Sequence, residues 1–417
     1  MELIVRTENE SNFNWLKKAL GEEYSYKYNT IPEPRHLNAS FSNADDGFHF
    51  LPKKIQELLK FDKTDFIISY KKRNLEIPII SLEITASAPL TQHIEQRMAR
   101  MICAAELGIV PIYICPKYTK TEDKEYRFSE KYFDLFQKIG TINKLPCVLF
   151  NFPDNDGVLL HDEEFFGCPE IKNSNTLYLI KFIKEVILES QKKDNYDFNY
   201  FNNSVIKKTF SIQSVLSKGK KYDVEKMGTC NLIKTEELFN YIRSYSKLDK
   251  LHLKNIFNNT ATKKISLREK SLIFHIGKYR ELKLSRLFAH SGDPYVGMLA
   301  ALDYAFCRIG PSVEERDVNL IFIPGNNEDK YFEKVFSTKG YNRFWKNSCP
   351  FKYLDIDRDL SNLDQSESEI LVQENIKKLN KISHHLEHGC TYSKERPLKM
   401  YAHYCDMIVF KDAILTF

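Results

Sequence analysis

Two apolar runs joined by a short charged turn are the feature that most constrains how this chain can fold. Residues 66–70 and 77–82 flank the turn at 71–74, and this order of residue types predicts a β-hairpin. Asp65 precedes the first run, and Glu83 interrupts the end of the second. A carboxylate in an otherwise buried strand is costly unless it is paired or binds a metal. The pattern therefore indicates chemistry at this end of the hairpin.

The segments on either side of the hairpin predict a mixed sheet covered by helices. From Leu51 on, apolar residues recur three and four positions apart, which is typical of a helix. Residues 91–107 predict a second helix that ends at Gly108. Residues 109–115 then form an apolar run typical of a buried strand. Helix, hairpin, helix and strand in this order predict an α/β core.

The remaining segments predict two domains. Residues 191–203 have no apolar period and predict a boundary between a domain at 1–190 and a second, α+β domain at 191–417. In the first domain we expect strands at 3–5 and 147–152, helices at 14–20 and 177–188, a polar loop at 22–46 and a charged connection at 117–131. In the second we expect helices at 235–247, 267–280, 296–308 and 367–382, and strands at 318–323 and 407–410.

Composition favours a soluble protein of the cytoplasm. The nine cysteines are scattered singly without a CxxC pair, which fits free thiols in a reducing compartment. The N-terminus lacks a signal-peptide pattern, and no run approaches the ~20 apolar residues that span a bilayer. The formal charge of +5 over 417 residues is mild, so local clusters of Lys and Arg matter more for a polyanionic partner than the sum.

The two acids of the hairpin are candidate metal ligands. Adjacent antiparallel strands lie ~5 Å apart, so Asp65 and Glu83 can share one divalent cation. Glu57, on the helix that leads into the hairpin, is a candidate third ligand. A metal held there would polarise a phosphodiester and lower the pKa of an attacking water.

Residues 64–68 (Thr-Asp-Phe-Ile-Ile) and 80–85 (Ile-Ser-Leu-Glu-Ile-Thr), with the helix and strand that follow, resemble the core of PD-(D/E)xK nucleases. The resemblance covers residues 51–116 and implies the restriction-endonuclease-like fold. It also implies that Asp65 and Glu83 bind Mg²⁺.

The same resemblance places a Lys two residues after the Glu, where it assists the attacking water, and here Thr85 occupies that position. Gln92 and His93, on the helix that follows, are the candidates for orienting the water instead, and Arg97 is a further one.

The resemblance implies a magnesium-dependent endodeoxyribonuclease that cuts double-stranded DNA at specific sequences, a type II restriction endonuclease. Cutting both strands implies a homodimer. Residues 1–190 would hold the hydrolytic core and residues 191–417 would supply target recognition. Two alternatives are a catalytically inactive DNA-binding protein with the nuclease fold, and a nuclease for RNA or DNA-repair intermediates.

Purely structural interpretations apply to the same residues. Asp65 can be a turn residue, and Glu83 can pair with an arginine such as Arg97. Gln92 and His93 can begin a solvated helix face, and Glu57 can be a surface acid.

Candidate DNA contacts come from both halves of the chain. The first half offers Arg97, Lys71 and Lys72. In the second half, the Gly-containing turn at 291–295 with nearby arginines suits phosphate contact, and the candidates are Arg286, Tyr295 and Arg308. The alternative is that this turn only caps the helix that follows it.

The histidines and cysteines of the tail are a weaker metal candidate. His384 and His388 lie four positions apart, and Cys390 and Cys405 would complete a tetrahedral zinc site. The spacing matches no common zinc motif, so we expect these residues to serve surface and packing roles.

Overall fold

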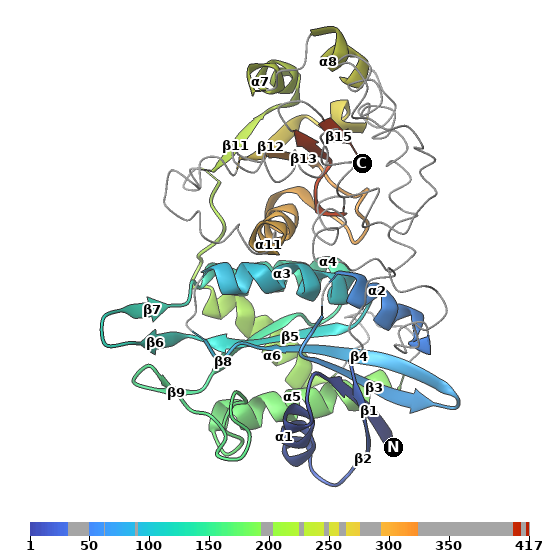
Figure 1. The fold of residues 1–417 in the computed structure, drawn as a ribbon, viewed down its shortest axis with the longest axis vertical. Helices are drawn as coiled ribbons and strands as arrows, with labels where there is room; N and C mark the ends of the chain where they lie inside the picture. Colours follow the sequence, from blue (N-terminus) through green and yellow to red (C-terminus); the bar gives the residue numbers. More distant parts are fainter. Residues whose placement is uncertain are drawn as a thin grey trace, which may run out of the picture. The chain divides into compact units, whose positions relative to one another are not determined.

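The computed structural model describes residues 1–31, 50–61, 63–87, 91–192, 203–224, 229–245, 250–257, 264–275, 293–323, 403–409 and 414–416. The chain divides into two compact units. Unit 1 comprises Met1–Pro34, Asp46–Tyr222 and Asp293–Ala305, and unit 2 comprises Arg35–Asp45, Asp223–Gly292 and Phe306–Phe417. Each unit is a mixed α/β structure, which confirms the predicted fold class (Figure 1).

Unit 1 is built on a six-stranded sheet with the order β2-β1-β3-β4-β5-β8. Its strands are β1 (Glu2–Thr7), β2 (Ser25–Thr30), β3 (Phe66–Lys72), β4 (Leu75–Ile84), β5 (Val110–Pro116) and β8 (Val148–Phe152). β3 and β4 form the predicted antiparallel hairpin, and β4, β5 and β8 run parallel. β2 lies within the segment expected to be a polar loop and instead pairs parallel with β1.

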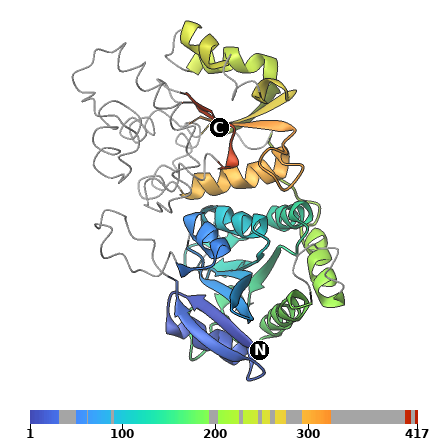
Figure 2. The same ribbon diagram turned by 90° about the vertical axis from the view of Figure 1, so that its right-hand side faces the viewer.

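Helices cover both faces of this sheet. They are α1 (Glu10–Leu20), α2 (Lys53–Phe61), α3 (Thr91–Glu106), α4 (Lys131–Asn143), α5 (Ser174–Ser190) and α6 (Ser204–Leu216). α1 and α5 lie on one face, and α2, α3 and α4 lie on the other (Figure 1, Figure 2). The predicted apolar stripe of α2 is buried, since its Ile55, Leu58 and Leu59 pack against Ile67 of β3.

Two small hairpins extend the carboxyl end of the parallel strands. β6 (Tyr118–Lys120) and β7 (Glu125–Arg127) follow β5, and β9 (Asp154–Asn155) and β10 (Val158–Leu159) follow β8. The charged connection expected at 117–131 therefore contains a hairpin. Both hairpins lie at the end of the sheet where β4 also ends, on the left in Figure 1.

Unit 1 extends beyond the predicted boundary near residue 190 because α6 completes the edge of its sheet. Gln213 of α6 accepts a hydrogen bond from the backbone N–H of Leu149 at 3.2 Å and donates to the carbonyl of Leu149 at 3.4 Å. One glutamine side chain thus pairs with the free edge of β8 as a neighbouring strand would. The boundary in the chain falls after Tyr222.

Unit 1 also takes in a helix from the second half of the sequence, α11 (Asp293–Leu302). It packs along α3, and the backbones approach so closely that a Cβ added to Gly297 would lie 1.4 Å from the carbonyl oxygen of Glu95. At the other end of α3, the hydroxyl of Tyr304 donates to Glu106 Oε1 at 2.8 Å. The predicted two-part division of the sequence is therefore wrong for residues 191–222 and 293–305.

Unit 2 holds a five-stranded mixed sheet with the order β11-β12-β13-β14-β15. The strands are β11 (Cys230–Lys234), β12 (Lys270–His275), β13 (Val318–Ile323), β14 (Met407–Val409) and β15 (Ile414–Thr416), with helices α7 (Leu238–Tyr245) and α8 (Lys250–Phe257). The central strands β12, β13 and β14 run parallel.

The predicted helix at 267–280 is wrong where the structure describes it, because residues 270–275 form β12. Leu272, Ile273 and Phe274 are all fully buried. Three consecutive apolar residues are typical of a parallel strand covered on both faces. The predicted helix at 367–382 lies outside the described residues.

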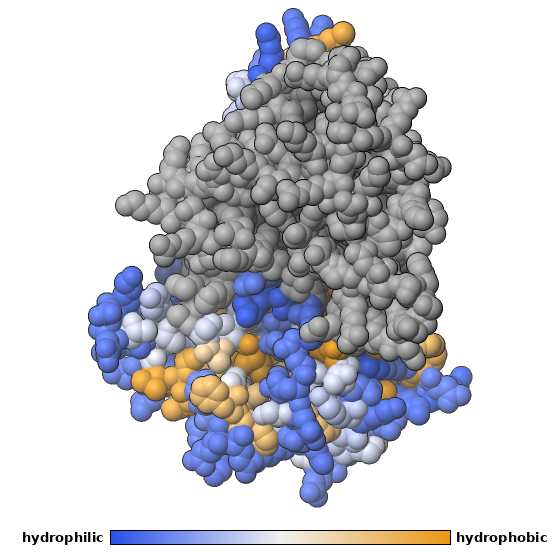
Figure 3. Space-filling model, in the orientation of Figure 1, coloured by the Kyte–Doolittle hydropathy of each residue, from blue (hydrophilic) through white to orange (hydrophobic). Residues whose placement is uncertain are grey.

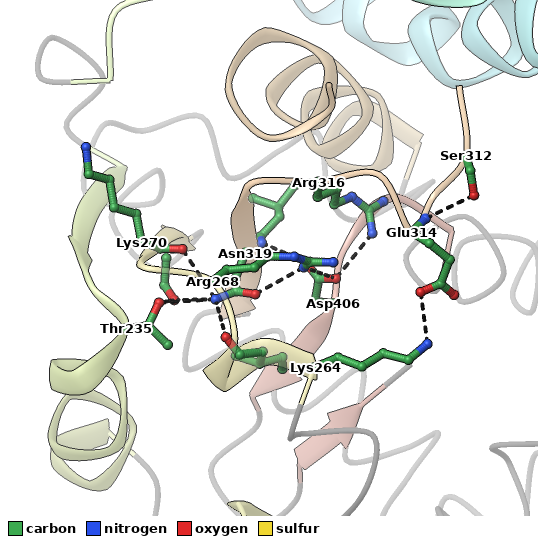
Figure 4. A network of polar contacts seen from close by, with 12 residues as sticks. Thr235, Lys264, Arg268, Lys270, Ser312, Glu314, Arg316, Asn319 and Asp406 are labelled. Carbon is green, nitrogen blue, oxygen red and sulfur yellow. Dashed lines mark hydrogen bonds and ion pairs between the residues drawn. The ribbon is translucent and has the colours of Figure 1, made fainter. Parts of the chain in front are cut away.

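A buried polar network closes the amino ends of the parallel strands in unit 2 (Figure 4). Asp406 accepts from Arg268 Nη1 at 2.8 Å and from Arg316 Nη1 at 3.3 Å through Oδ1, and from the N–H of Leu320 at 2.9 Å through Oδ2. Asn319 donates to Thr235, among others. Ligands of such sheets bind at the carboxyl ends of the strands, so we assign this network a structural role.

No helix in the described part of the chain is both long enough and apolar enough to cross a membrane.

Candidate active site

The hairpin brings its two acids together, as predicted. Asp65 directly precedes β3, and Glu83 is the last residue but one of β4. The N–H of Asp65 donates to Glu83 Oε1 at 3.2 Å, and the N–H of Ile84 donates to Asp65 Oδ2 at 2.7 Å. Each acid is thus fixed by the backbone of the opposite strand, which makes the pair a preorganised feature of the hairpin.

Two arginines of α3 face this acid pair. Arg100 donates Nη1 to Glu83 Oε1 at 3.0 Å and to the carbonyl of Lys63 at 2.5 Å. Arg97 Nε lies 3.5 Å from Glu83 Oε2. The sequence offered the pairing of Glu83 with Arg97 as a structural alternative to metal binding, and this ion pair is present. Arg100 was missed, although its place three residues after Arg97 puts both on one helix face.

The acids lie in a low-dielectric setting. Glu83 is 0% exposed, and burial raises its pKa to about 8, with Arg100 acting in the opposite direction and Asp65 adding to the increase. Burial also raises the pKa of Asp65, while its hydrogen bond from Ile84 lowers it. Within the described part of the chain, Glu83 Oε2 accepts no hydrogen bond despite its burial. Its charged neighbour is Arg97 Nε at 3.5 Å, so Oε2 is ion-paired without being hydrogen-bonded.

Thr85, which stands where the nuclease pattern has a Lys, is held by a tyrosine. Its hydroxyl lies 3.0 Å from that of Tyr113 on β5, and both side chains are buried. Tyr113 pairs with Glu83 across the strands and stacks on Phe136 of α4. Burial raises the pKa of Tyr113, so the phenol stays protonated and can donate a hydrogen bond. A neutral pair of hydroxyls therefore occupies the place of the expected ammonium group.

A loop from another part of the sequence borders Asp65, which is only partly buried. The charge of Asp65 acts on Cys168, whose pKa is raised to about 12, chiefly by burial and next by Asp162. Lys63 also lies beside the pair and forms an ion pair with Glu8 at 3.1 Å. Cys168 and Glu8 were not expected from the sequence, because they lie far from Asp65 along the chain.

The structure does not bring Glu57 into a common metal site with the other two acids. No group of three or more His, Cys, Asp or Glu residues suited to a metal occurs among the described residues. Glu57 lies on α2, and its charge acts on Cys103 of α3, whose pKa is raised mainly by burial. Two carboxylates still fit Mg²⁺, which uses one or two protein carboxylates and keeps several waters. Of the three candidate ligands, the structure brings together only Asp65 and Glu83.

Four further predicted site residues belong to unit 1, and the structure describes the side chains of two of them. Gln92 and His93 lie in the first turn of α3, at the carboxyl end of the sheet, but their side chains are outside the description. Lys71 and Lys72 are exposed at the far end of β3, roughly 20 Å from Asp65 at about 3.3 Å per residue. They are not part of the acid site.

Of the three DNA contacts predicted in the second half, the structure corrects Arg308, and the side chains of the other two are not described. Arg308 is 1% exposed and donates to the carbonyl of Pro311 at 3.1 Å, so its guanidinium is an internal group and not a surface contact. Arg286 and the side chain of Tyr295 are outside the described residues, as are His384, His388 and Cys390 of the tail. Cys405 is fully buried.

Comparisons with family models, curated proteins and solved structures give no match to this chain.

Proposed function

We propose that this protein is a magnesium-dependent nuclease that hydrolyses phosphodiester bonds of double-stranded DNA, with Asp65 and Glu83 as the metal ligands. One observation carries the proposal: the hairpin fixes two carboxylates side by side, and Glu83 Oε2 is buried without accepting a hydrogen bond. This oxygen is ion-paired with Arg97 at 3.5 Å without accepting a hydrogen bond, so a divalent cation could replace that contact.

The chain's own residues would perform distinct tasks in this reaction. Asp65 and Glu83 would hold the cation, which lowers the pKa of a bound water when present. Arg100 would act as a positioning residue, since it ties Glu83 to the backbone before β3. The hydroxyl of Thr85, two residues after Glu83, and that of Tyr113, which pairs with Glu83 across the strands, would orient water. Gln92 and His93 remain proposed for the same task.

The biological role of a type II restriction endonuclease, including sequence specificity and a homodimer, belongs to the same proposal. It rests on the resemblance of residues 51–116 to PD-(D/E)xK nucleases. The order of helix α2, hairpin β3–β4, helix α3 and strand β5 supports it, because that is the order which the resemblance implies.

The test is cleavage of supercoiled and linear DNA with Mg²⁺. We expect discrete fragments from the wild type and none from Glu83→Gln or Asp65→Asn. The matched control is Glu95→Gln, because Glu95 is also a buried glutamate with a pKa raised to about 8, but its carboxylate contacts Tyr132 and not the acid pair. Cleavage that survives in both acid variants would reject the proposal.

A second candidate function is DNA binding without cleavage. It is favoured by the two arginines, which balance the acids without a metal, and by Thr85 at the position of the Lys. Binding without cleavage in either Mg²⁺ or Mn²⁺ would support this candidate. Cleavage of RNA or of branched DNA, with intact linear duplex, would instead support the nuclease alternatives.

A further inference from the structure

A cluster of lysines gathers around one acid at the start of α4. We call Glu130, Lys131, Lys218 and Lys220 the Glu130 cluster. Lys218 Nζ lies 3.3 Å from Glu130 Oε1, and Lys220 Nζ lies 2.6 Å from Glu130 Oε2. The two lysine side chains are 65% and 60% exposed, so both ammonium groups face solvent while they bracket one carboxylate. The cluster carries more positive charge than its acid can balance.

The turn that presents these lysines follows the end of α6. Lys218 and Gly219 are consecutive left-handed residues, with φ of 51° and 72°. The turn is closed by the N–H of Lys220, which donates to the carbonyl of Ser217 at 2.9 Å. Left-handed residues just after a helix commonly end it, and this turn ends α6. Here the conformation directs two lysines to the same side.

Lys131 adds a third cation to the cluster. Its Nζ lies 4.2 Å from the ring centre of Tyr222 and 5.2 Å from that of Tyr132. Tyr132 in turn donates its hydroxyl to Glu95 Oε1 on α3 at 3.1 Å, two residues before Arg97. Packed side chains therefore connect the Glu130 cluster with the helix that bears the arginines of the acid pair.

The cluster lies at the same end of the sheet as the acids. α4 begins at Lys131, after the hairpin β6–β7 that follows β5, and the N–H of Phe128 donates to the carbonyl of Lys117 at the base of that hairpin at 2.9 Å. Residues 117–131 and 218–221 together carry eight Lys or Arg and four Asp or Glu. Figure 3 shows hydrophilic side chains over this hairpin, on the left.

We propose that the Glu130 cluster and the cations of the hairpin β6–β7 bind the phosphate backbone of double-stranded DNA on its way to the acid pair. The inference rests on the proposed function for the identity of the polyanion. Lysine ammonium groups on a preorganised turn suit phosphate oxygens, and each contact releases condensed counterions. Glu130 holds the lysines in the absence of DNA and competes with phosphate for them.

The experiment measures binding of the full chain to a short fluorescent duplex without divalent metal, between about 50 and 200 mM salt. We expect Lys218→Ala/Lys220→Ala to weaken binding roughly tenfold and to reduce the slope of log K against log salt by about two. The matched control is Lys17→Ala/Lys181→Ala, which removes the same charge from exposed positions of α1 and α5 on the opposite face of the sheet. We expect a much smaller effect from the control.

Glu130→Gln provides a test that loss of folding cannot imitate. It removes the competing acid and keeps all three lysines, so we expect DNA to bind severalfold more tightly. A merely structural role for the ion pairs predicts no gain in affinity. Unchanged binding in both the lysine and the Glu130 variants would overturn the proposal, as would a preference for anionic lipid vesicles over DNA.

Failure of this inference is distinguishable from failure of the proposed nuclease. If Glu83→Gln abolishes cleavage while the lysine variants bind DNA normally, the nuclease stands and the surface is wrong. If the lysine variants lose DNA binding but the wild type cleaves nothing, the surface stands and the activity is wrong.

Discussion

Glu83 on β4 and Arg100 on α3 form a buried ion pair, with Nη1 of the arginine 3.0 Å from Oε1 of the glutamate. The same nitrogen donates to the carbonyl of Lys63, directly before Asp65. One guanidinium thus links the end of one hairpin strand to the beginning of the other. The distance between the two acids therefore depends on a residue of the helix that follows.

Arg100→Met tests this dependence. Because Glu83 and the carbonyl of Lys63 lose the hydrogen bonds of Arg100, we expect the free energy of unfolding to fall by about 1–3 kcal/mol. The pKa of Glu83 should rise further, so cleavage should require a higher pH. Denaturant unfolding and a pH–rate profile measure the two effects. Arg127→Met, at a largely exposed arginine, should change stability by less than about 0.5 kcal/mol.

Stability should fall as the pH rises. Burial raises the pKa values of Glu83 and Glu95 to about 8, above the unfolded value of 4.5. Between these values the folded chain binds more protons than the unfolded chain, so the free energy of unfolding decreases with pH. The decrease is at most about 1.4 kcal/mol per pH unit for each group. Urea titrations at several pH values between about 4.5 and 8 measure it.

Cleavage should change with pH in the opposite direction. A proton on Glu83 competes with Mg²⁺, so we expect activity to increase up to a pH of about 8. Glu95→Gln should reduce the pH dependence of stability and leave the pH profile of cleavage intact. A flat activity profile across this range would contradict the assignment of Glu83 as a metal ligand.

Tyr113→Phe separates the two hydroxyls beside the acids. Loss of the phenol leaves the buried hydroxyl of Thr85 without this partner, and we expect a cost of about 1–3 kcal/mol. If the pair orients water, kcat should fall more than KM changes. Thr85→Val/Tyr113→Phe removes both hydroxyls and should restore part of the stability but none of the activity. If Tyr113→Phe keeps full activity, this pair of hydroxyls does not orient the attacking water, and Gln92 and His93 remain the candidates for that role.

Gly297→Ala should push α11 away from α3. The new Cβ would lie 1.4 Å from the backbone oxygen of Glu95, a contact that no rotation of a side chain can relieve. We expect destabilisation of about 3 kcal/mol or more, at the upper end for overpacked sites. Thermal unfolding measures the effect, and an unchanged Tm would mean that the two helices separate without cost.

Asp406→Ala should destabilise unit 2. The substitution leaves Arg268 and Arg316 buried beside each other without their shared carboxylate, at an expected cost of about 3–5 kcal/mol. Limited proteolysis should then cleave between residues 223 and 292 first. Asp162→Ala, a buried acid of unit 1, provides the comparison, and equal cleavage patterns in the two variants would contradict the assignment.

Local patterns predicted the elements around the acids, because each is coded within a few residues. The hairpin β3–β4 follows from two apolar runs and a charged turn, and α3 follows from its apolar spacing. The strand β12 was misread as a helix because a short apolar run has no period of its own. The partners of Glu83 were harder to predict, since the sequence places Arg97 and Arg100 on one helix face but does not show that this face packs over Glu83.

The place of α11 in unit 1 bears on how the chain is made. Residues 223–292 separate this helix from the rest of its unit in the sequence. A ribosome adding roughly 5–20 residues per second needs roughly 4–17 s to advance from Tyr222 to Ala305. During that interval the surface of α3 that receives Gly297 is uncovered. Unit 1 therefore reaches its complete form only after nearly half of the second half of the chain has been synthesised, and a nascent chain ending before residue 293 is an expected binding target for chaperones.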